Sequence, residues 1–232
     1  GHRARGLKGE ALGPVSLALQ LTDEDDRPLA YDPVLREALL HHLALRVAWH
    51  YEQLSTYTDH VIFCLDEPFL DALDLPLCPF ERDEGMDMIG RLLADMPGCR
   101  GLCVGGDVAW ATLLALPVDL VLFDAYEHGA SPIEEAAAVA DFIGRGGMLG
   151  WGIVPVDPGA LAQERADLLA HRLEMAVDYL ATASGLDQRR IFDASLITSS
   201  DSLSTLSVEG AEQALRMCAA ISQRLREAHG LG

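Results

Sequence analysis

The sequence predicts an α/β protein in which parallel strands alternate with helices. Five apolar runs each stop at a cluster of polar residues, and segments with helical spacing lie between the runs. Runs rich in Val, Ile, Leu and Phe are typical of buried parallel strands, and polar residues at their carboxyl ends are typical of a binding pocket. These five expected strands cover residues 61–67, 101–107, 120–126, 148–155 and 194–201.

An earlier apolar run, residues 11–21, brings the expected number of strands to about six. Six strands fit an open, doubly wound sheet, whereas a closed β/α barrel needs about eight and would lack about two of them here. No glycine-rich phosphate fingerprint follows a strand, which disfavours a dinucleotide-binding site. Because no linker or internal repeat divides the chain, we expect a single domain over residues 1–232.

Helices are expected where apolar side chains recur every three or four residues. The first covers residues 33–54, and Asp32 before Pro33 marks its start. Its core stripe is expected to contain Leu35, Leu39, Leu43 and Val47, widened by Ala38, Leu45 and Trp49. Further helices are expected over residues 84–95, 107–116, 131–144, 159–183 and 208–229, the last capped by Ser207.

Charge and composition exclude several classes of function. The chain has 36 Asp and Glu residues against 17 Lys and Arg residues, its formal net charge is -19, and Lys8 is the only lysine. We therefore expect no nucleic-acid partner and no anionic membrane partner. The longest apolar stretch, residues 108–123, is interrupted by Pro117 and Asp119, so no membrane span is expected. Five cysteines without a CxxC pair predict free thiols in a reducing cytoplasm.

Two adjacent carboxylates end the strand at residues 61–67. Pro68 cannot extend the ladder of the sheet, so Asp66 and Glu67 are expected at the rim of a pocket. Paired carboxylates can bind a substrate ammonium group, hold a metal ion or act as a general base. We predict that both residues are catalytic and that Asp66 also binds substrate. The alternative is a solvated strand end or a structural cap.

Three further strand ends carry possible metal ligands, namely Cys103, Asp124 and Asp201. One thiolate and two carboxylates that converge can hold zinc, although carboxylate-rich sites favour harder ions. The alternatives are a buried core thiol for Cys103 and loop caps for the two aspartates. Tyr126 and Trp151, also near strand ends, are predicted to line the substrate pocket, or else to belong to the ordinary core.

Several of these motifs resemble, in the same order, the cobalamin-independent methionine synthase family, which shares a superfamily with uroporphyrinogen decarboxylase. Residues 8–16 (KGEALGPVS) are similar to the family's KGxxTGPVT, and residues 62–68 end in its DEP. Residues 103–110 (CVGGDVAW) are similar to HCCGNTDW of the short-form members. The segments FDAY, WGIVP and SLITSSDSLSTLS resemble FDAY, WGIVP and SLITPSCGLGSLS.

The resemblance implies a TIM-type (β/α)8 barrel that here lacks the first strands, so that the domain is incomplete at its N-terminal side. It also implies zinc held by a His, a Cys, an acid and a second Cys, which fall on Cys103, Gly105, Asp124 and Asp201. A shift of two residues keeps Cys103 as the Cys and places Gly101 at the His. Neither register keeps the usual ligand set, so the resemblance implies an altered or lost zinc site. Asp66 matches the acid that binds the substrate's amino group.

The first functional hypothesis is therefore a methionine-synthase-like methyltransferase domain. It would transfer a methyl group from a folate or a methylcorrinoid protein to the thiol of a homocysteine-like amino acid. One alternative is a divergent barrel enzyme of the decarboxylase branch, although few arginines lie at the strand ends to clamp a polycarboxylate. Another alternative is a binding module that has lost catalysis.

Overall fold

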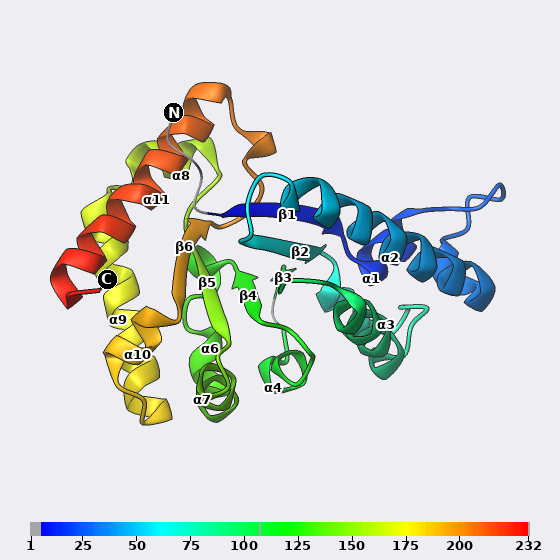
Figure 1. Cartoon of the computed structure of the whole chain (residues 1–232), viewed down its shortest axis with the longest axis horizontal. Coiled ribbons are helices and arrows are strands. Elements are labelled where there is room, and N and C mark those ends of the chain that lie inside the picture. Colours follow the sequence, from blue (N-terminus) through cyan, green and yellow to red (C-terminus); the bar gives the residue numbers. More distant parts are fainter. Residues whose placement is uncertain (1–5, 107, 232) are drawn as a thin grey trace. The chain divides into compact units, whose positions relative to one another are not determined.

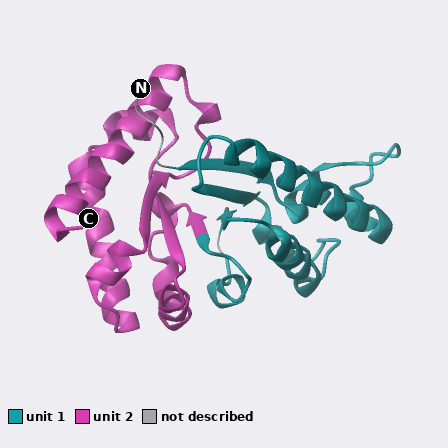
Figure 2. Ribbon diagram, in the orientation of Figure 1, with its two compact units in different colours: residues 1–120 teal, residues 121–232 magenta. Residues whose placement is uncertain are grey.

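A computed structural model describes residues 6–106 and 108–231. The chain divides into two compact units, residues 1–120 (unit 1) and residues 121–232 (unit 2), which Figure 2 shows in different colours. In each unit, strands alternate with helices along the chain (Figure 1). The predicted α/β class is confirmed. Asp107, the expected first residue of one helix, lies outside the described residues.

Unit 1 contains three parallel strands in sequence order, with β2 between β1 and β3. Helix α2 packs against β1 and β2, and helices α1 and α3 pack against α2. The elements are β1 (Leu7–Leu12), α1 (Pro14–Gln20), η1 (Leu29–Tyr31), α2 (Pro33–Ser55), β2 (Val61–Glu67), η2 (Leu70–Asp74), α3 (Arg82–Asp95), β3 (Cys99–Val104) and α4 (Trp110–Leu114).

The prediction of a strand over residues 11–21 is wrong. The strand β1 ends at Leu12, and Pro14 occupies the first turn of helix α1. Gly13 has an extended backbone, and the fixed φ of a proline suits the first turn of a helix, where its missing N–H is not needed. An apolar run therefore changes from strand to helix at Gly13-Pro14.

The core stripe of α2 is narrower than its sequence predicts. Leu39, Leu43 and Val47 are buried as expected, but Leu45 and Trp49 are 74% and 58% exposed. Each of the two exposed residues follows a buried one by two positions, which is about 200° around a helix. They therefore lie on the side of α2 that faces away from the sheet. The predicted start of α2 is confirmed, because the Asp32 side chain accepts hydrogen bonds from the first turn.

Unit 2 contains β4, β5 and β6, with β5 between the other two and parallel to β6. The predicted helix over residues 159–183 is two helices, because the chain is extended at Glu164 and Arg165. The elements are β4 (Leu120–Phe123), α5 (Ala125–His128), α6 (Ser131–Glu134), α7 (Ala136–Gly144), β5 (Met148–Val154), α8 (Pro158–Gln163), α9 (Ala166–Ser184), α10 (Gln188–Asp193), β6 (Ser195–Ser199), η3 (Leu203–Thr205) and α11 (Val208–His229).

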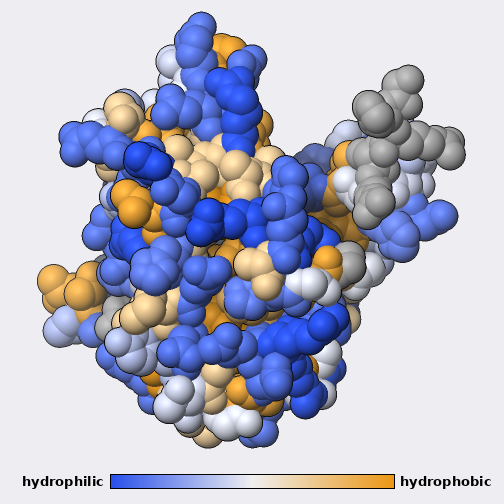
Figure 3. Space-filling view, turned by 90° about the vertical axis from the view of Figure 1, so that its left-hand side faces the viewer, coloured by the Kyte–Doolittle hydropathy of each residue, from blue (hydrophilic) through white to orange (hydrophobic). Residues whose placement is uncertain are grey.

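Hydrophilic and apolar side chains both reach the surface. On the side viewed in Figure 3, hydrophilic side chains predominate and apolar side chains are scattered between them. None of the helices in the described part of the chain is both long and apolar enough to cross a lipid bilayer. All five cysteines are free thiols.

Candidate functional site

One face of the sheet in unit 1 carries charged groups and thiols. Glu10 is the register partner of Cys64, and Asp66 is the register partner of Cys103. Because side chains alternate between the two faces of a strand, Lys8, Glu10, Cys64, Asp66 and Cys103 share one face. The predicted residues Asp66 and Cys103 are thus neighbours at the carboxyl ends of β2 and β3.

The charged residues of β1 reach Cys103. Lys8 Nζ lies 2.6 Å from Glu10 Oε2 and 3.9 Å from Cys103 Sγ, and Cys103 Sγ lies 4.0 Å from Glu10 Oε2. The side chains of Lys8 and Glu10 are each about two-fifths exposed, at 41% and 42%. A ligand therefore has access to a fixed ammonium group. We call Lys8, Glu10, Asp66 and Cys103 the strand-face cluster.

Protonation in the strand-face cluster follows from its contacts. A hydrogen bond with Cys64 and then burial raise the pKa of the Cys103 thiol well above its usual value. Burial lowers the pKa of Lys8, but the electrostatic interactions with the nearby Cys103 and Cys64 side chains and the hydrogen bond with Glu10 outweigh burial and raise the pKa overall. At neutral pH Cys103 is therefore a neutral thiol and Lys8 is a cation.

The packing of Cys64 requires a glycine on the adjacent strand. A Cβ atom at Gly101 would collide with Cys64 Sγ, because the thiol lies directly over Gly101. Gly101 is also the register partner of Cys64. Because Gly101 has no side chain, the Cys64 thiol has room to lie over it and to contact Cys103. Cys64 is completely buried.

Glu67 points away from the strand-face cluster and caps a helix. Its Oε1 accepts a hydrogen bond from the Val15 N–H at 3.0 Å, and its Oε2 accepts one from the Ser16 N–H at 2.7 Å. These are N–H groups of the first turn of α1, which have no partner within the helix. The side chain is fully buried. This placement favours the structural alternative for Glu67, and its catalytic role stays a prediction.

Burial makes Glu67 a source of pH-dependent stability. Burial raises its pKa from 4.5 to about 7, against the lowering effect of the hydrogen bonds from Ser16 and Val15. Between these pH values the folded state keeps a proton that the unfolded state releases. The contribution of Glu67 to stability is therefore fully present below pH 4.5 and falls by about 3 kcal/mol as the pH rises to about 7. Urea unfolding across this range should show the loss in the wild type, and the Glu67→Gln variant should lack this part of it. If the free energy of unfolding had the same pH dependence in both proteins, the assignment of this loss to Glu67 would be wrong.

In unit 2, the predicted metal ligand Asp124 is a helix cap. Its Oδ1 accepts hydrogen bonds from the N–H groups of Tyr126 and Glu127, at 2.9 and 3.0 Å. Burial raises the pKa of this carboxyl, although the two hydrogen bonds lower it. Asp201 is exposed, and its Oδ1 accepts the N–H of Ser202 at 2.6 Å. Both aspartates thus have the structural roles that sequence analysis left open for them.

Tyr126 and Trp151 line one cavity of unit 2, as their predicted role requires. Trp151 is fully buried, and its Nε1 donates to Ser195 Oγ at 2.9 Å. The Tyr126 hydroxyl donates to Glu164 Oε1 at 2.8 Å, and this hydrogen bond raises the pKa of Tyr126. Their role as substrate-binding residues stays a prediction.

The zinc site predicted at Cys103, Asp124 and Asp201 stays a prediction. Cys103 Sγ lies 3.9 Å from Lys8 Nζ, so a metal ion bound there would have a cation as neighbour and would have to displace the proton of the thiol. Cys103 belongs to unit 1, whereas Asp124 and Asp201 belong to unit 2, so their convergence stays a prediction. Within residues 6–106 and 108–231, no group of three or more His, Cys, Asp or Glu side chains is arranged to hold a metal ion.

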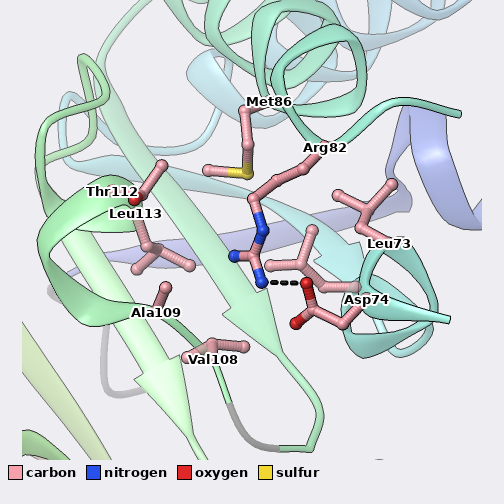
Figure 4. A pocket seen from close by; sticks show the side chains of 9 residues that line it. Leu73, Asp74, Arg82, Met86, Val108, Ala109, Thr112 and Leu113 are labelled. Carbon is pink, nitrogen blue, oxygen red and sulfur yellow. Dashed lines mark hydrogen bonds and ion pairs between the residues drawn. The ribbon is translucent and has the colours of Figure 1, made fainter.

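A small cavity in unit 1 is closed by an ion pair between Arg82 and Asp74 (Figure 4). Leu73, Met86 and Leu113 are among the apolar side chains around it. Its volume is about 10 Å³, roughly the space of one water molecule. This cavity is too small for an organic ligand.

Sequence analysis missed Lys8 and Glu10 as site residues. The expected first strand began at residue 11, after both of them, so neither was placed on a strand. Two charged residues at alternate positions before an apolar segment are the signal that could have found them, because such residues share one face of a strand.

A comparison with models of known protein families found no match for this chain, and a search of curated proteins found no match either.

Proposed function

We propose that this chain is a methyltransferase domain on a TIM-type barrel scaffold that methylates the thiol of an amino-acid-like substrate such as homocysteine. The observation that carries the proposal is the strand-face cluster, where an ammonium group and a carboxylate border one thiol at the ends of parallel strands. Carboxyl ends of parallel strands are where α/β proteins bind their ligands.

The strand-face cluster has complementary charges for a zwitterion. In this proposal Asp66 binds the ammonium group of the substrate, and Lys8 binds its carboxylate. Glu10 holds the Lys8 ammonium group in place through the contact at 2.6 Å. Charge-assisted hydrogen bonds of this kind are about twice as strong as neutral ones. An amino acid would thus be held at both charged ends.

Methyl transfer requires that the substrate thiol attack the methyl carbon as a thiolate. A free thiol with a pKa of about 8.5 is mostly protonated at neutral pH. A cation nearby lowers the pKa of a thiol, and Lys8 is such a cation. In this proposal Lys8 therefore increases the thiolate fraction of the bound substrate. The methyl donor is a folate or a methylcorrinoid protein. As the S–C bond forms, the bond between the methyl carbon and its donor breaks and its electron pair stays on the donor, which leaves as tetrahydrofolate after taking up a proton or as the reduced corrinoid.

A binding module without catalysis is the second candidate. It is favoured by the helix-capping contacts of Asp124 and by the protonated thiol of Cys103, since neither group is arranged to activate a substrate. Such a module would bind the amino acid without methylating it.

Transfer of a labelled methyl group to homocysteine tests the proposal. We expect labelled methionine with methyltetrahydrofolate or with a methylated corrinoid protein as donor, and a rate about tenfold lower for Lys8→Met. Arg46→Met, which removes an exposed cation of unit 1, is the matched control and should retain the wild-type rate. Zinc content is measured on the same samples. Binding of homocysteine without product from either donor would exclude the methyltransferase and leave the binding module.

A further inference from the structure

The cavity of unit 2 that Tyr126 and Trp151 line contains none of the strand-face cluster, to which the proposed methyl transfer is assigned. Its volume is about 370 Å³, which lies in the usual range of about 300–1,000 Å³ for small-molecule sites. Side chains from β5 line it on one side and side chains from α9 on another, with Tyr126 and the residues after it completing the wall. The cavity is therefore between a strand and its covering helices.

Three aromatic residues line this cavity, namely Tyr126, Trp151 and Tyr179. Trp151 is fully buried and its indole N–H is bonded to Ser195, so it belongs to the packed wall behind the cavity, and Tyr126 and Tyr179 provide the accessible rings. Tyr179 is 57% exposed, which leaves much of its ring available for contact. Aromatic rings favour flat aromatic partners, which they meet in stacked or edge-to-face arrangements.

Arg172 provides a fixed cation at the same cavity. Its guanidinium carbon lies 4.7 Å from the centre of the Tyr126 ring, and its Nη2 donates to the Tyr126 carbonyl oxygen at 2.8 Å. Its Nη1 lies 3.5 Å from Glu164 Oε1. A guanidinium group has five N–H donors, more than these contacts use, so it can also bind an anionic group. His171 lies beside Arg172 on the lining.

We propose that this cavity binds a flat aromatic compound that carries one anionic group. The aromatic body lies against the rings of Tyr126 and Tyr179, and the anionic group binds Arg172. Glu127 lines the cavity and Glu164 lies 3.5 Å from Arg172 Nη1, and both repel an anion, so the anionic group is placed at the N–H groups of Arg172 that Glu164 does not contact. Because the whole chain carries a net charge of -19, an anion binds only where a local cation compensates for this repulsion.

Fluorescence titration of the full chain with two matched probes tests this inference. The probes are anilinonaphthalene sulfonate, which is an aromatic anion, and phenylnaphthylamine, which is its neutral counterpart. We expect saturable binding of both. Arg172→Met should weaken the sulfonate about tenfold and leave the neutral probe unchanged, whereas Arg172→Lys should retain most of the sulfonate affinity. Arg224→Met, at an exposed arginine of α11, is the control and should change neither.

A cavity-filling variant locates the binding. Ala176 lines the cavity, and Ala176→Phe should weaken both probes at least about tenfold, whereas Ala219→Phe on the exposed side of α11 should not. Circular dichroism and thermal unfolding show that each variant is folded. Unchanged binding in Ala176→Phe would overturn the site, and equal weakening of both probes by Arg172→Met would overturn the anion-binding role of the arginine.

Discussion

Replacement of Glu67 by Ala is expected to lower the free energy of unfolding by about 3 kcal/mol at about pH 5, where the carboxyl group is protonated in the folded state. The variant leaves the N–H groups of Val15 and Ser16 without their acceptor. It also leaves a cavity at a fully buried position. Unsatisfied buried donors and cavities are the changes that destabilise proteins most. Urea unfolding followed by circular dichroism measures the loss.

A second variant separates the loss of hydrogen bonds from the loss of side-chain volume, and a third serves as the control. Glu67→Gln keeps the shape of the side chain, but its amide NH₂ faces one of the two backbone donors, so we expect a smaller loss of about 1–2 kcal/mol. Glu81→Ala, at an exposed position with no side-chain capping bond, is the control and should change stability by less than about 0.5 kcal/mol. If Glu67→Ala were as stable as Glu81→Ala, the capping role of Glu67 would be wrong.

Asp66→Asn is expected to weaken the binding of homocysteine roughly 10- to 100-fold. The physical reason is the loss of a charge-assisted hydrogen bond, worth about 1.5–3 kcal/mol, between the Asp66 carboxylate and the ammonium group of the substrate. Isothermal titration calorimetry measures the affinity. Asp59→Asn removes an exposed carboxylate of the same unit and should bind homocysteine as tightly as the wild type.

Thermal unfolding of these variants distinguishes lost recognition from lost folding. The Asp66 side chain is only partly buried, so Asp66→Asn should unfold within a few degrees of the wild type. Equal homocysteine affinity in Asp66→Asn and Asp59→Asn would remove Asp66 from the binding site. The arrangement of Lys8, Glu10 and Cys103 would then have to serve a purpose other than binding homocysteine.

The local signals in the sequence predicted much of the fold. Apolar runs marked five of the six strands that the described residues form, within a few residues of their observed bounds, and Asp32 and Ser207 marked two helix starts. These signals succeed because buried strands and capped helices depend mainly on neighbouring residues. The polar ends of β2 and β3 likewise led to Asp66 and Cys103, which the register places side by side.

The errors occurred where distant residues decide the local structure. Helix α1 begins at the local signal Gly13-Pro14, and the N–H groups of its first turn bond to Glu67, more than fifty residues later, a partner of which the apolar run from Ala11 to Leu21 gives no sign. Because the first strand was expected to begin at residue 11, Lys8 and Glu10 were not placed on a strand. The roles of Glu67 and Asp124 as caps depend on which face or turn each carboxylate occupies, and residue type alone does not fix this.

We propose that the strand-face cluster recognises both charged ends of an amino-acid thiol. Calorimetric titration of the wild type with homocysteine and with its analogue that lacks the amino group measures this recognition. We expect homocysteine to bind at least about tenfold more tightly, because only homocysteine offers an ammonium group to Asp66. Equal affinities for the two compounds, or no detectable binding of homocysteine, would contradict it.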